Sequence, residues 1–529
     1  MDRFSPPESC DVVVIGAGMG GLVAAALLSN AGLDTLVCDP QPRPGGYLAG
    51  FGRKEFIFDS AIHWLNQCGP GGSVYRVLDF LGDDHPKCEP LKEIRRYKGQ
   101  SFDELLTNDP DVLRRDWLDR FPSERDGINR FFADAQEIGD AMAKLARLVR
   151  APASFNLLEY ARFGIRMALC SRPFISKYKL TGAQGLDLYF KEDEIKRVFA
   201  TEADFMSIIV PIGWAYHHDF QAPPIGGSQA FPRWLQKHVE AKGSRIMLGR
   251  GASRVEVAKG RAVGVVLEAK PRRNISEQLV RCKHVIATND ILTLYEEMLP
   301  PDAVPASLIM KLKKMETYSS SVTLSIGLDC PAEALGFGEE MLSLTRDDVP
   351  REQQNCGDPE LAAITVLAPT TRDPSLAPAG KGTLTIYVSA EIEYGDHWKT
   401  SEGLKRGEAY VAFKKAYADV VLKRVERELS IDVRGHIEVM KIATPVTHWR
   451  YTGNRGGSLM GGRPTRPNIR NRVASYYTPV KNLLLGGHWA EYGGGVPIAT
   501  RAGANAALLI LKKTNRTEYR RLRDVLDGG

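Results

Sequence analysis

Three glycines, Gly16, Gly18 and Gly21, stand in the spacing G-x-G-x-x-G near the start of this sequence. Glycine in such a turn lets the backbone approach a pyrophosphate, and the unpaired N–H groups of a following helix bind its oxygens. Asp39 lies 18 residues beyond Gly21, close to the ~20 expected of an acid that binds a ribose 2′-hydroxyl. These residues predict a dinucleotide site and disfavour a cofactor that carries a 2′-phosphate.

A strand, a turn and a helix must position these glycines. The run "VVVI" before Gly16 is typical of a buried parallel strand, and "DTLVCD" predicts a second strand that ends at Asp39. The apolar stretch from Asp11 to Leu28 is also long enough to resemble a membrane span or a secretory signal. Its glycines and the mixed charge of the preceding "MDRFSPPESCD" argue against both.

The loop after Asp39, "DPQPRPGG", contains Arg43 and the pair Gly45 and Gly46. A guanidinium and backbone amides at these positions can face a phosphate or the edge of a flavin ring. With these residues in register, the chain resembles the flavin-dependent superfamily of amine oxidases, phytoene desaturases and Rab GDP-dissociation inhibitors. The resemblance implies FAD as the cofactor.

A second motif, "NLLLGGHWAEYGGGVPIATRAGANAA", covers residues 482–507 and predicts a strand, a glycine-rich turn and a small-residue helix. It resembles the C-terminal flavin motif of the carotenoid desaturase and isomerase branch. The resemblance implies that Gly494, Gly495 and Val496 offer amides to the flavin carbonyls. Gly487 and His488 replace the usual Gly-Asp, so His488 either hydrogen-bonds the cofactor or is a surface histidine.

The resemblance extends over most of the chain and predicts an α/β fold. A Rossmann-like FAD-binding domain would consist of residues 1–80, 225–300 and 440–529, with a backbone group near Val255 on the adenine. An interleaved substrate domain with a mixed β-sheet and helices would take residues 81–224 and 301–439, and would also contact the membrane.

Composition narrows the remaining classes. The 529 residues are 43% hydrophobic and 25% charged, as in a globular protein of more than one domain. A net charge of +6 is too small to indicate a nucleic-acid partner. The eight cysteines are scattered without a C-x-x-C pair, which favours reduced thiols in a cytoplasmic protein and no metal site. The sequence does not indicate the oligomeric state.

Residues 144–179 carry eight basic residues and one acid among apolar residues at helical spacing. One interpretation is a helix packed on the core with a solvated basic face, and the other is peripheral contact with an anionic bilayer. Resemblance to desaturases that take water-insoluble polyenes from membranes supports the second interpretation. The basic C-terminal tail, "LKKTNRTEYRRLRD", either adds to this attraction or is a solvated helix end.

Two stretches, "FIFDSAIHWLN" and "TPVTHWRYTGNRGGSLMGG", most resemble carotenoid isomerases and retinol saturases, which carry an Asp-x-Gly-x-His pattern. Asp59 and His63 match that pattern, whereas Ala61 replaces its glycine. His63 is either an acid or base of the pocket or a structural residue. Arg450 and Tyr451 are further catalytic candidates beside the flavin.

The expected function is therefore an FAD-dependent enzyme for a hydrophobic small-molecule substrate. It would desaturate, saturate or isomerise carbon–carbon double bonds of a long isoprenoid such as a carotenoid or retinoid. Three alternatives stay open: a flavin-dependent desaturase of an acyl or polyketide chain, a flavin amine oxidase, and a non-catalytic prenyl-lipid-binding protein of the same fold.

Overall fold

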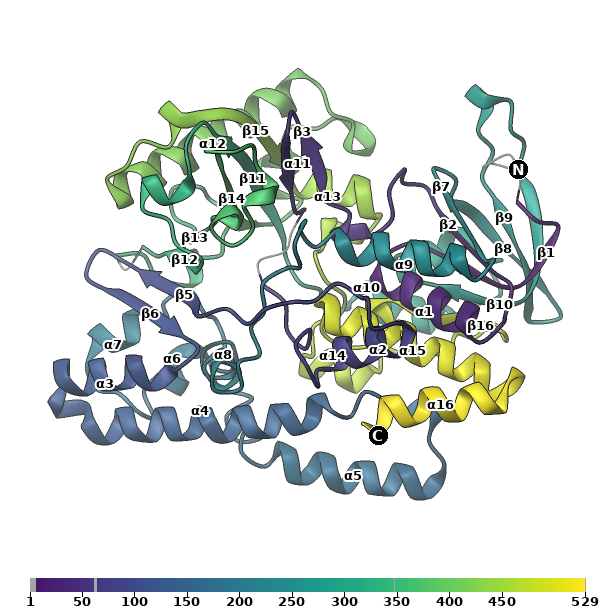
Figure 1. The fold of residues 1–529 in the computed structure, drawn as a ribbon, viewed down its shortest axis with the longest axis horizontal. Coiled ribbons are helices and arrows are strands. Elements are labelled where there is room, and N and C mark those ends of the chain that lie inside the picture. Colours follow the sequence, from purple (N-terminus) through teal and green to yellow (C-terminus); the bar gives the residue numbers. More distant parts are fainter. Residues whose placement is uncertain (1–5, 61–63, 347, 529) are drawn as a thin grey trace.

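The computed structural model describes residues 6–60, 64–346 and 348–528, which form two β-sheets with helices around them (Figure 1). The first sheet has the order β7-β2-β1-β10-β9-β8, with β16 added beside β10. Its strands are β1 (Ser9–Ile15), β2 (Thr35–Asp39), β7 (Arg245–Leu248), β8 (Ala252–Ala258), β9 (Arg261–Leu267), β10 (Gln278–Ala287) and β16 (Leu483–Leu485). β7, β2, β1, β10 and β16 run parallel, whereas β8 and β9 form an antiparallel extension.

The second sheet has the order β15-β11-β14-β13-β12-β5-β6. This sheet is mixed, because β12 and β5 are parallel, whereas all other neighbouring strands of the sheet are antiparallel. Its strands are β5 (Glu93–Lys98), β6 (Asp103–Thr107), β11 (Ser320–Leu328), β12 (Met341–Leu344), β13 (Ile364–Leu367), β14 (Gly382–Ala390) and β15 (Ile437–Ala443). The strands β3 (Phe51–Arg53) and β4 (Phe56–Phe58) pair with each other in a separate short hairpin.

The helices fall into three groups, which Figure 1 separates. Those near the first sheet are α1 (Met19–Asn30), α2 (Ser73–Leu81), α9 (Ala230–Ala241), α10 (Ala306–Lys313), α14 (Arg466–Asn471), α15 (Gly495–Thr514) and α16 (Arg516–Asp527). A second group consists of α3 (Pro110–Arg120), α4 (Arg125–Ala146), α5 (Leu157–Ser171), α6 (Gly182–Leu186), α7 (Asp193–Arg197) and α8 (Met206–Tyr216). Beside the second sheet lie α11 (Tyr394–Trp398), α12 (Glu408–Leu429) and α13 (Pro445–Thr452).

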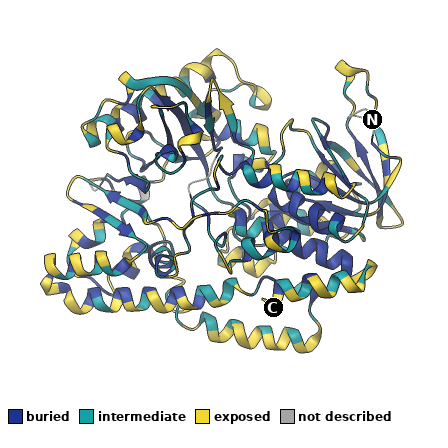
Figure 2. Ribbon diagram, in the orientation of Figure 1, coloured by how far each residue is buried: buried dark blue, intermediate teal, exposed yellow. Residues whose placement is uncertain are grey.

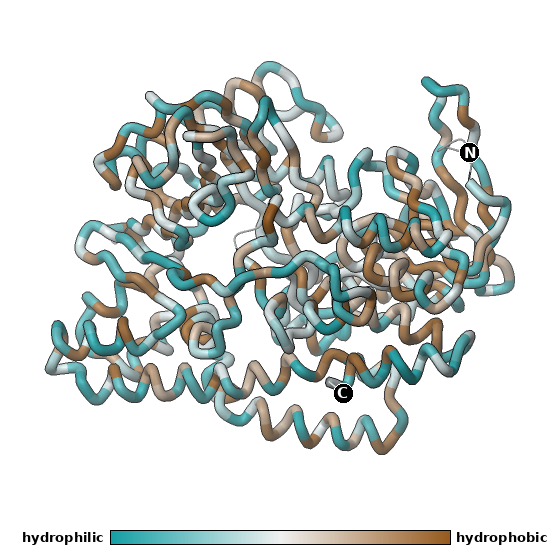
Figure 3. Tube along the Cα trace, in the orientation of Figure 1, coloured by the Kyte–Doolittle hydropathy of each residue, from teal (hydrophilic) through white to brown (hydrophobic). Residues whose placement is uncertain are grey.

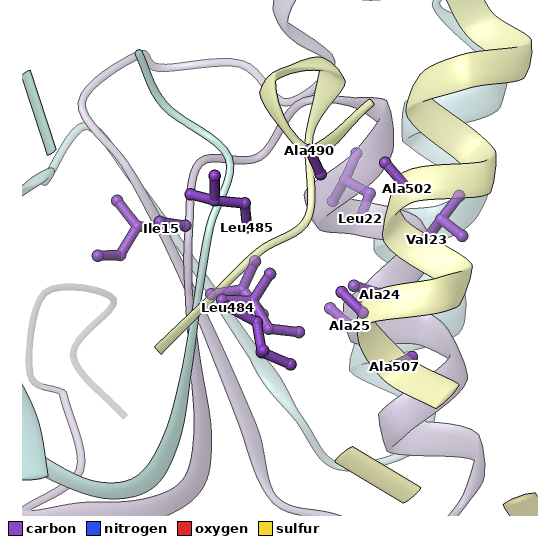
Figure 4. Packing of buried hydrophobic residues seen from close by; sticks show 14 of the residues in the cluster. Ile15, Leu22, Val23, Ala24, Ala25, Leu484, Leu485, Ala490, Ala502 and Ala507 are labelled. Atoms are coloured by element: carbon purple, nitrogen blue, oxygen red, sulfur yellow. The ribbon is translucent and has the colours of Figure 1, made fainter. Parts of the chain in front are cut away.

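Backbone contact between α1 and α15 holds the two ends of the chain together. A Cβ atom at Gly503 would lie 2.1 Å from the Gly20 carbonyl oxygen, so only glycine fits this crossing. Small residues continue the interface, where Ala24 and Ala25 of α1 lie close to Ala507 of α15 (Figure 4). Such close packing makes the helix pair part of one buried core with the first sheet.

The C-terminal tail also packs on this core. Leu522 and Leu526 of α16 are buried in the same cluster, and Arg150 bridges Asp527 of α16 to Glu159 of α5, both at 2.8 Å. The tail is thus a docked amphipathic helix and not a free basic arm.

The predicted α/β class with a Rossmann-like sheet and a second, mixed sheet is confirmed. All strands of the first sheet lie within the predicted segments 1–80, 225–300 and 440–529. β15 crosses the predicted boundary at residue 440 and belongs to the second sheet, while the domain boundaries themselves stay a prediction. In the part of the chain that the structure describes, no helix has both the length and the hydropathy needed to span a membrane.

Candidate functional site

Four loops meet at the carboxyl ends of the parallel strands. The chain leaves β1, β2, β10 and β16 at Ile15, Asp39, Ala287 and Leu485. The Thr288 amide donates to the Ile15 carbonyl at 2.9 Å, and the Gly486 amide donates to the Ala287 carbonyl at 3.0 Å. The ends of β1 and β16 therefore lie close together, as Figure 4 shows for Ile15 and Leu485. Ligands of open α/β sheets bind at this edge.

Packing requires two of the three fingerprint glycines, but not the third. Gly16 has a φ of +103°, and a Cβ atom there would lie 2.3 Å from Oγ1 of Thr288. A Cβ atom at Gly21 would lie 2.0 Å from the Gly16 carbonyl oxygen. At Gly18, by contrast, a Cβ atom would find no described protein atom within 4 Å. Gly18 precedes the first turn of α1, so its lack of a side chain leaves the amides at this end of the helix open to approach.

Asp39 is held in place by two amides. Ala17 in the glycine turn donates to Oδ2 at 2.8 Å, and Gln41 donates to Oδ1 at 2.8 Å. Burial raises the pKa of Asp39, and these two amides oppose the rise. Each carboxylate oxygen keeps a second lone pair, so Asp39 can still accept a hydrogen bond from a hydroxyl group.

The loop after Asp39 folds back onto the glycine turn. The Gly45 amide donates to the Ala17 carbonyl at 2.7 Å, and a Cβ atom at Gly46 would lie 3.5 Å from the Cα atom of Gly18. Arg43 is exposed and donates to a carbonyl of its own loop at 3.4 Å. The fold thus brings Gly45 and Gly46 to the turn and leaves Arg43 at its outer side.

The C-terminal motif reaches the same place. A Cβ atom at Gly20 would lie 2.5 Å from the Gly486 carbonyl oxygen and 3.2 Å from the Cα atom of Gly487. Two motifs at opposite ends of the sequence therefore share one edge, as a single cofactor site requires.

The first turn of α15 begins beside this contact. Gly494 precedes the helix, Gly495 and Val496 are its first residues, and Val496 is buried. A Cβ atom at Gly494 would lie 2.3 Å from the Cβ atom of Met460, so Met460 covers this end. The first amides of a helix have no partner within it, which makes the start of α15 a second donor group.

Several buried polar atoms near this motif have no hydrogen-bond partner among the described residues. Among the described residues, buried atoms without a hydrogen bond include Nε2 of His488, Nε1 of Trp489, Oγ1 of Thr500, and Nε and Nη2 of Arg455. Burial lowers the pKa of His488 to about 4, so its ring is neutral at pH 7. Buried polar atoms rarely stay unsatisfied, so this set fits a cofactor with its own donors and acceptors. His488 is half-buried and packs on Trp489, unlike a free surface histidine.

Sequence reasoning missed three side chains between the two sheets. The Tyr47 hydroxyl donates to the Ser458 carbonyl at 2.8 Å, and the rings of Tyr47 and His448 lie 5.9 Å apart. Nε2 of His448 is 3.2 Å from the Ser321 hydroxyl of β11. Burial lowers the pKa of His448 to about 4 and raises that of Tyr47. Tyr47 directly follows Gly46, a signal that could have identified it.

Arg450 and Tyr451, two of the predicted catalytic residues, are exposed on α13. Tyr451 is 55% exposed, and Arg450 is exposed and stacks on the Tyr451 ring at 5.8 Å. The buried residues of this helix are instead Pro445, Val446 and His448. At the start of α13 the Thr444 amide donates to Oγ1 of Thr447 at 3.2 Å, and the buried side of the helix does not include Arg450 or Tyr451. His63 lies outside the described residues, and a catalytic role for these three side chains stays a prediction.

Val255 and Asp59 have structural contacts that sequence did not reveal. Val255 is buried on β8, where its amide donates to the Met298 carbonyl at 2.9 Å. Asp59 is buried and accepts from the amide of Ser228 at 2.9 Å and from its hydroxyl at 2.5 Å. Asp59 therefore joins the chain just after β4 to the turn at Ser228. Contact of Val255 with adenine stays a prediction.

Two other clusters lie away from this edge. A groove of about 420 Å³, lined by Arg261, His284, Lys481 and Lys513 among others, adjoins the amino-terminal end of β16. Asp329, Cys330 and His436 have possible metal-ligating atoms within 4.8 Å of one another. Asp329 and Cys330 follow the carboxyl end of β11, and His436 precedes β15, so this cluster lies away from the cofactor edge, as does the groove.

Comparison with known proteins decides the family. A model of the flavin-containing amine oxidoreductases matches residues 19–511. The chain belongs to this family. The family indicates a flavin cofactor, and the protein is a flavin-dependent oxidoreductase.

Curated relatives place the chain within the branch that its motifs resemble. All-trans-retinol 13,14-reductase of Danio rerio is 26% identical over 524 residues, which cover 91% of this chain and 82% of the relative. Prolycopene isomerase 1 of an Oncidium hybrid cultivar is 24% identical over 473 residues, covering 86% and 76%. These relatives confirm the resemblance to the desaturase, isomerase and retinol saturase branch.

A solved structure supports the fold. An oxidoreductase from Methanosarcina mazei has a TM-score of 0.57 at 16% identity, covering 95% of this chain and 100% of the other. At this identity the likeness shows a shared fold and leaves the substrate open.

Proposed function

We propose that this protein is an FAD-dependent oxidoreductase that acts on carbon–carbon double bonds of a long hydrophobic isoprenoid. The reaction is a desaturation, a saturation or a cis–trans isomerisation. The observation that carries the proposal is the contact of Gly20 with Gly486 and Gly487, because it joins both flavin motifs in one site. The names of the relatives, a retinol 13,14-reductase and prolycopene isomerases, support the class of bond.

Each part of the edge has a role in holding FAD. The amides at the start of α1 would bind the diphosphate beside Gly18, and Asp39 would accept a ribose hydroxyl. The start of α15, at Gly495 and Val496, would donate to the carbonyls of the flavin ring. Nε2 of His488 is an unpaired buried atom next to this helix and would bond the chain between ring and diphosphate.

When bound, a flavin supplies hydride transfer to or from carbon. The side chains of Tyr47, Ser321 and His448 would hold the substrate and exclude water. Tyr47, Ser321 and His448 are uncharged at neutral pH, because the pKa of His448 is about 4 and burial raises that of Tyr47. Neutral groups of this kind suit an apolar polyene better than a charged amine.

The test begins with the absorption spectrum of the purified protein and identification of the released cofactor by chromatography. The protein is then incubated anaerobically, oxidised or reduced, with all-trans-retinol and with a poly-cis carotene. Gain of two hydrogens, loss of two hydrogens, or unchanged mass with altered retention each supports the proposal and identifies the reaction.

Other outcomes would overturn it. Release of hydrogen peroxide with amines, without any change in polyenes, would indicate an amine oxidase. Conversion of acyl or polyketide chains alone would exclude the isoprenoid. A protein that stays colourless after reconstitution with FAD would indicate a non-catalytic lipid-binding protein.

A further inference from the structure

Helix α5 turns a stripe of apolar side chains to solvent. Leu158, Ile165 and Leu169 are 60%, 62% and 67% exposed, and their spacing of seven and four residues forms one stripe. No residue of α5 is buried, and the helix lies at the lower edge of the molecule beside α4 (Figure 2). Hydrophobic residues nevertheless occur along the length of this helix (Figure 3). This arrangement is the reverse of a helix packed on a core, so that interpretation of residues 144–179 was wrong for α5.

Arginines flank the apolar stripe. Arg162, Arg166 and Arg172 are exposed, and no described acidic side chain forms an ion pair with them. Glu159, the single acid of residues 157–179, is already bound to Arg150 at 2.8 Å. The outer side of α5 is therefore both apolar and positively charged.

A second segment, residues 463–477, is tied to both ends of the α5 region. The Tyr178 hydroxyl donates to the Pro464 carbonyl, and the Tyr477 hydroxyl donates to the Ala153 carbonyl at 3.3 Å. Ile469 in this segment is 48% exposed. Residues 463–477 are thus bonded to the segments that precede and follow α5.

This segment repeats the chemistry of α5. Arg466, Arg470 and Arg472 are exposed, and within the described ranges none of them has an acidic partner. Together, residues 157–179 and 463–477 contain nine basic residues and one acid. Opposite charge would be needed on any partner that covers this surface.

The same segment adjoins the flavin motif. The Tyr492 hydroxyl donates to the Asn468 carbonyl at 2.9 Å, and the Gly493 amide donates to the Gly462 carbonyl at 2.9 Å. The basic surface is thus anchored directly to the glycines that precede α15.

We propose that α5 and residues 463–477 form a docking surface for an anionic lipid bilayer. The α5 helix lies flat in the interface, with Leu158, Ile165 and Leu169 among the acyl chains and the arginines at the headgroups. A helix with an apolar outer stripe and flanking arginines has the features of an interfacial helix, and each basic residue adds attraction to anionic lipid. A nucleic acid would leave the leucines in water, and the excess of positive charge opposes a second copy of the chain.

The test measures binding of the holoprotein to sedimented vesicles, without substrate. Vesicles contain phosphatidylcholine alone or mixed with phosphatidylglycerol. We expect at least tenfold stronger binding to the mixed vesicles and a decrease in high salt. Equal binding to both, or no binding to either, would overturn the proposal. A concentration-dependent dimer that buries α5 and is monomeric in L158S would also overturn it.

The first variant replaces Leu158, Ile165 and Leu169 with serine. It removes the apolar stripe without touching a buried residue, so flavin content and melting temperature should match the parent protein. We expect vesicle binding to weaken by about tenfold or more, because apolar burial drives insertion. Unchanged binding would show that α5 does not enter the bilayer.

The second variant replaces Arg466, Arg470 and Arg472 with glutamine. Each replacement should weaken binding to the mixed vesicles by roughly fivefold and leave binding to neutral vesicles unchanged. The matched control, Val411→Ser with Lys415→Gln on exposed positions of α12, should bind like the parent protein. An equal loss in this control would contradict the assignment of the surface. Because no turnover is measured, failure here would leave the proposed reaction standing.

Discussion

The helices α1 and α5 are both rich in apolar residues, but they occupy opposite environments. In α1 every residue except Asn30 is buried, whereas α5 has none buried. α1 contains glycines and alanines that allow backbone contact with α15, and it carries no charge. α5 has large side chains interrupted by Arg162 and Arg166. Hydropathy alone therefore does not decide burial, because residue volume and the spacing of charge decide which surface can be covered.

The strongest perturbation of the buried helix is Gly21→Val. The Cβ atom would lie 2.0 Å from the Gly16 carbonyl oxygen, so the strand and helix must separate. We expect loss of folded, flavin-containing protein, with a cost above the ~1–3 kcal/mol typical of an overpacked core. Soluble yield and flavin absorbance measure the effect. A variant with normal flavin content and melting temperature would contradict this packing.

One substitution made in both helices sharpens the comparison. Leu22 of α1 is fully buried, whereas Leu158 of α5 is 60% exposed. Leu22→Ala should lower the free energy of unfolding by about 2–5 kcal/mol, and Leu158→Ala should change it by less than about 0.5 kcal/mol. Chemical denaturation measures both values. Similar losses in the two variants would mean that α5 packs against the protein in solution.

Acid should act on the buried regions through His448. His448 is buried, with its pKa lowered by burial from 6.5 to about 4. Between these values the unfolded chain binds the proton and the folded protein does not, so stability falls as pH decreases from about 6.5 to about 4. The contribution of His448 is roughly 3 kcal/mol.

Denaturation across this pH range, with His448→Gln as the matched variant, measures the effect. The variant should show a shallower loss of stability than the parent protein. Identical pH profiles would indicate that His448 is protonated at its usual pKa in the folded state.

Gly18→Val should have the smallest effect on the fold and a selective effect on the cofactor. Its φ of −73° and ψ of 176° are open to valine, and a Cβ atom would meet no described atom within 4 Å. The apoprotein should melt close to the parent apoprotein, whereas flavin should bind at least tenfold more weakly, because the side chain occupies the approach of the diphosphate. Flavin retention unchanged by this variant would remove the diphosphate from the start of α1.

Much of the cofactor edge could be predicted because its signals are local. A turn at Gly16, a strand end at Asp39 and a helix start at Gly494 follow from neighbouring residues. The contacts of His448 with Tyr47 and with Ser321 could not be predicted, since the three residues come from distant segments that meet only when their elements pack. Arg450 and Tyr451 were candidates by residue type, but the phase of α13 turns His448 inward instead.

The sequence by itself determined the family, the flavin motifs and the alternation of elements, because glycine spacing and short-range periodicity depend on residues within a few turns of one another. Only the tertiary structure decided that Gly20 meets Gly486, that α5 faces outward and that residues 463–477 lie with it. Each of these contacts joins residues that are far apart in the chain. Such contacts depend on the packing of complete helices and strands, which no local sequence pattern encodes.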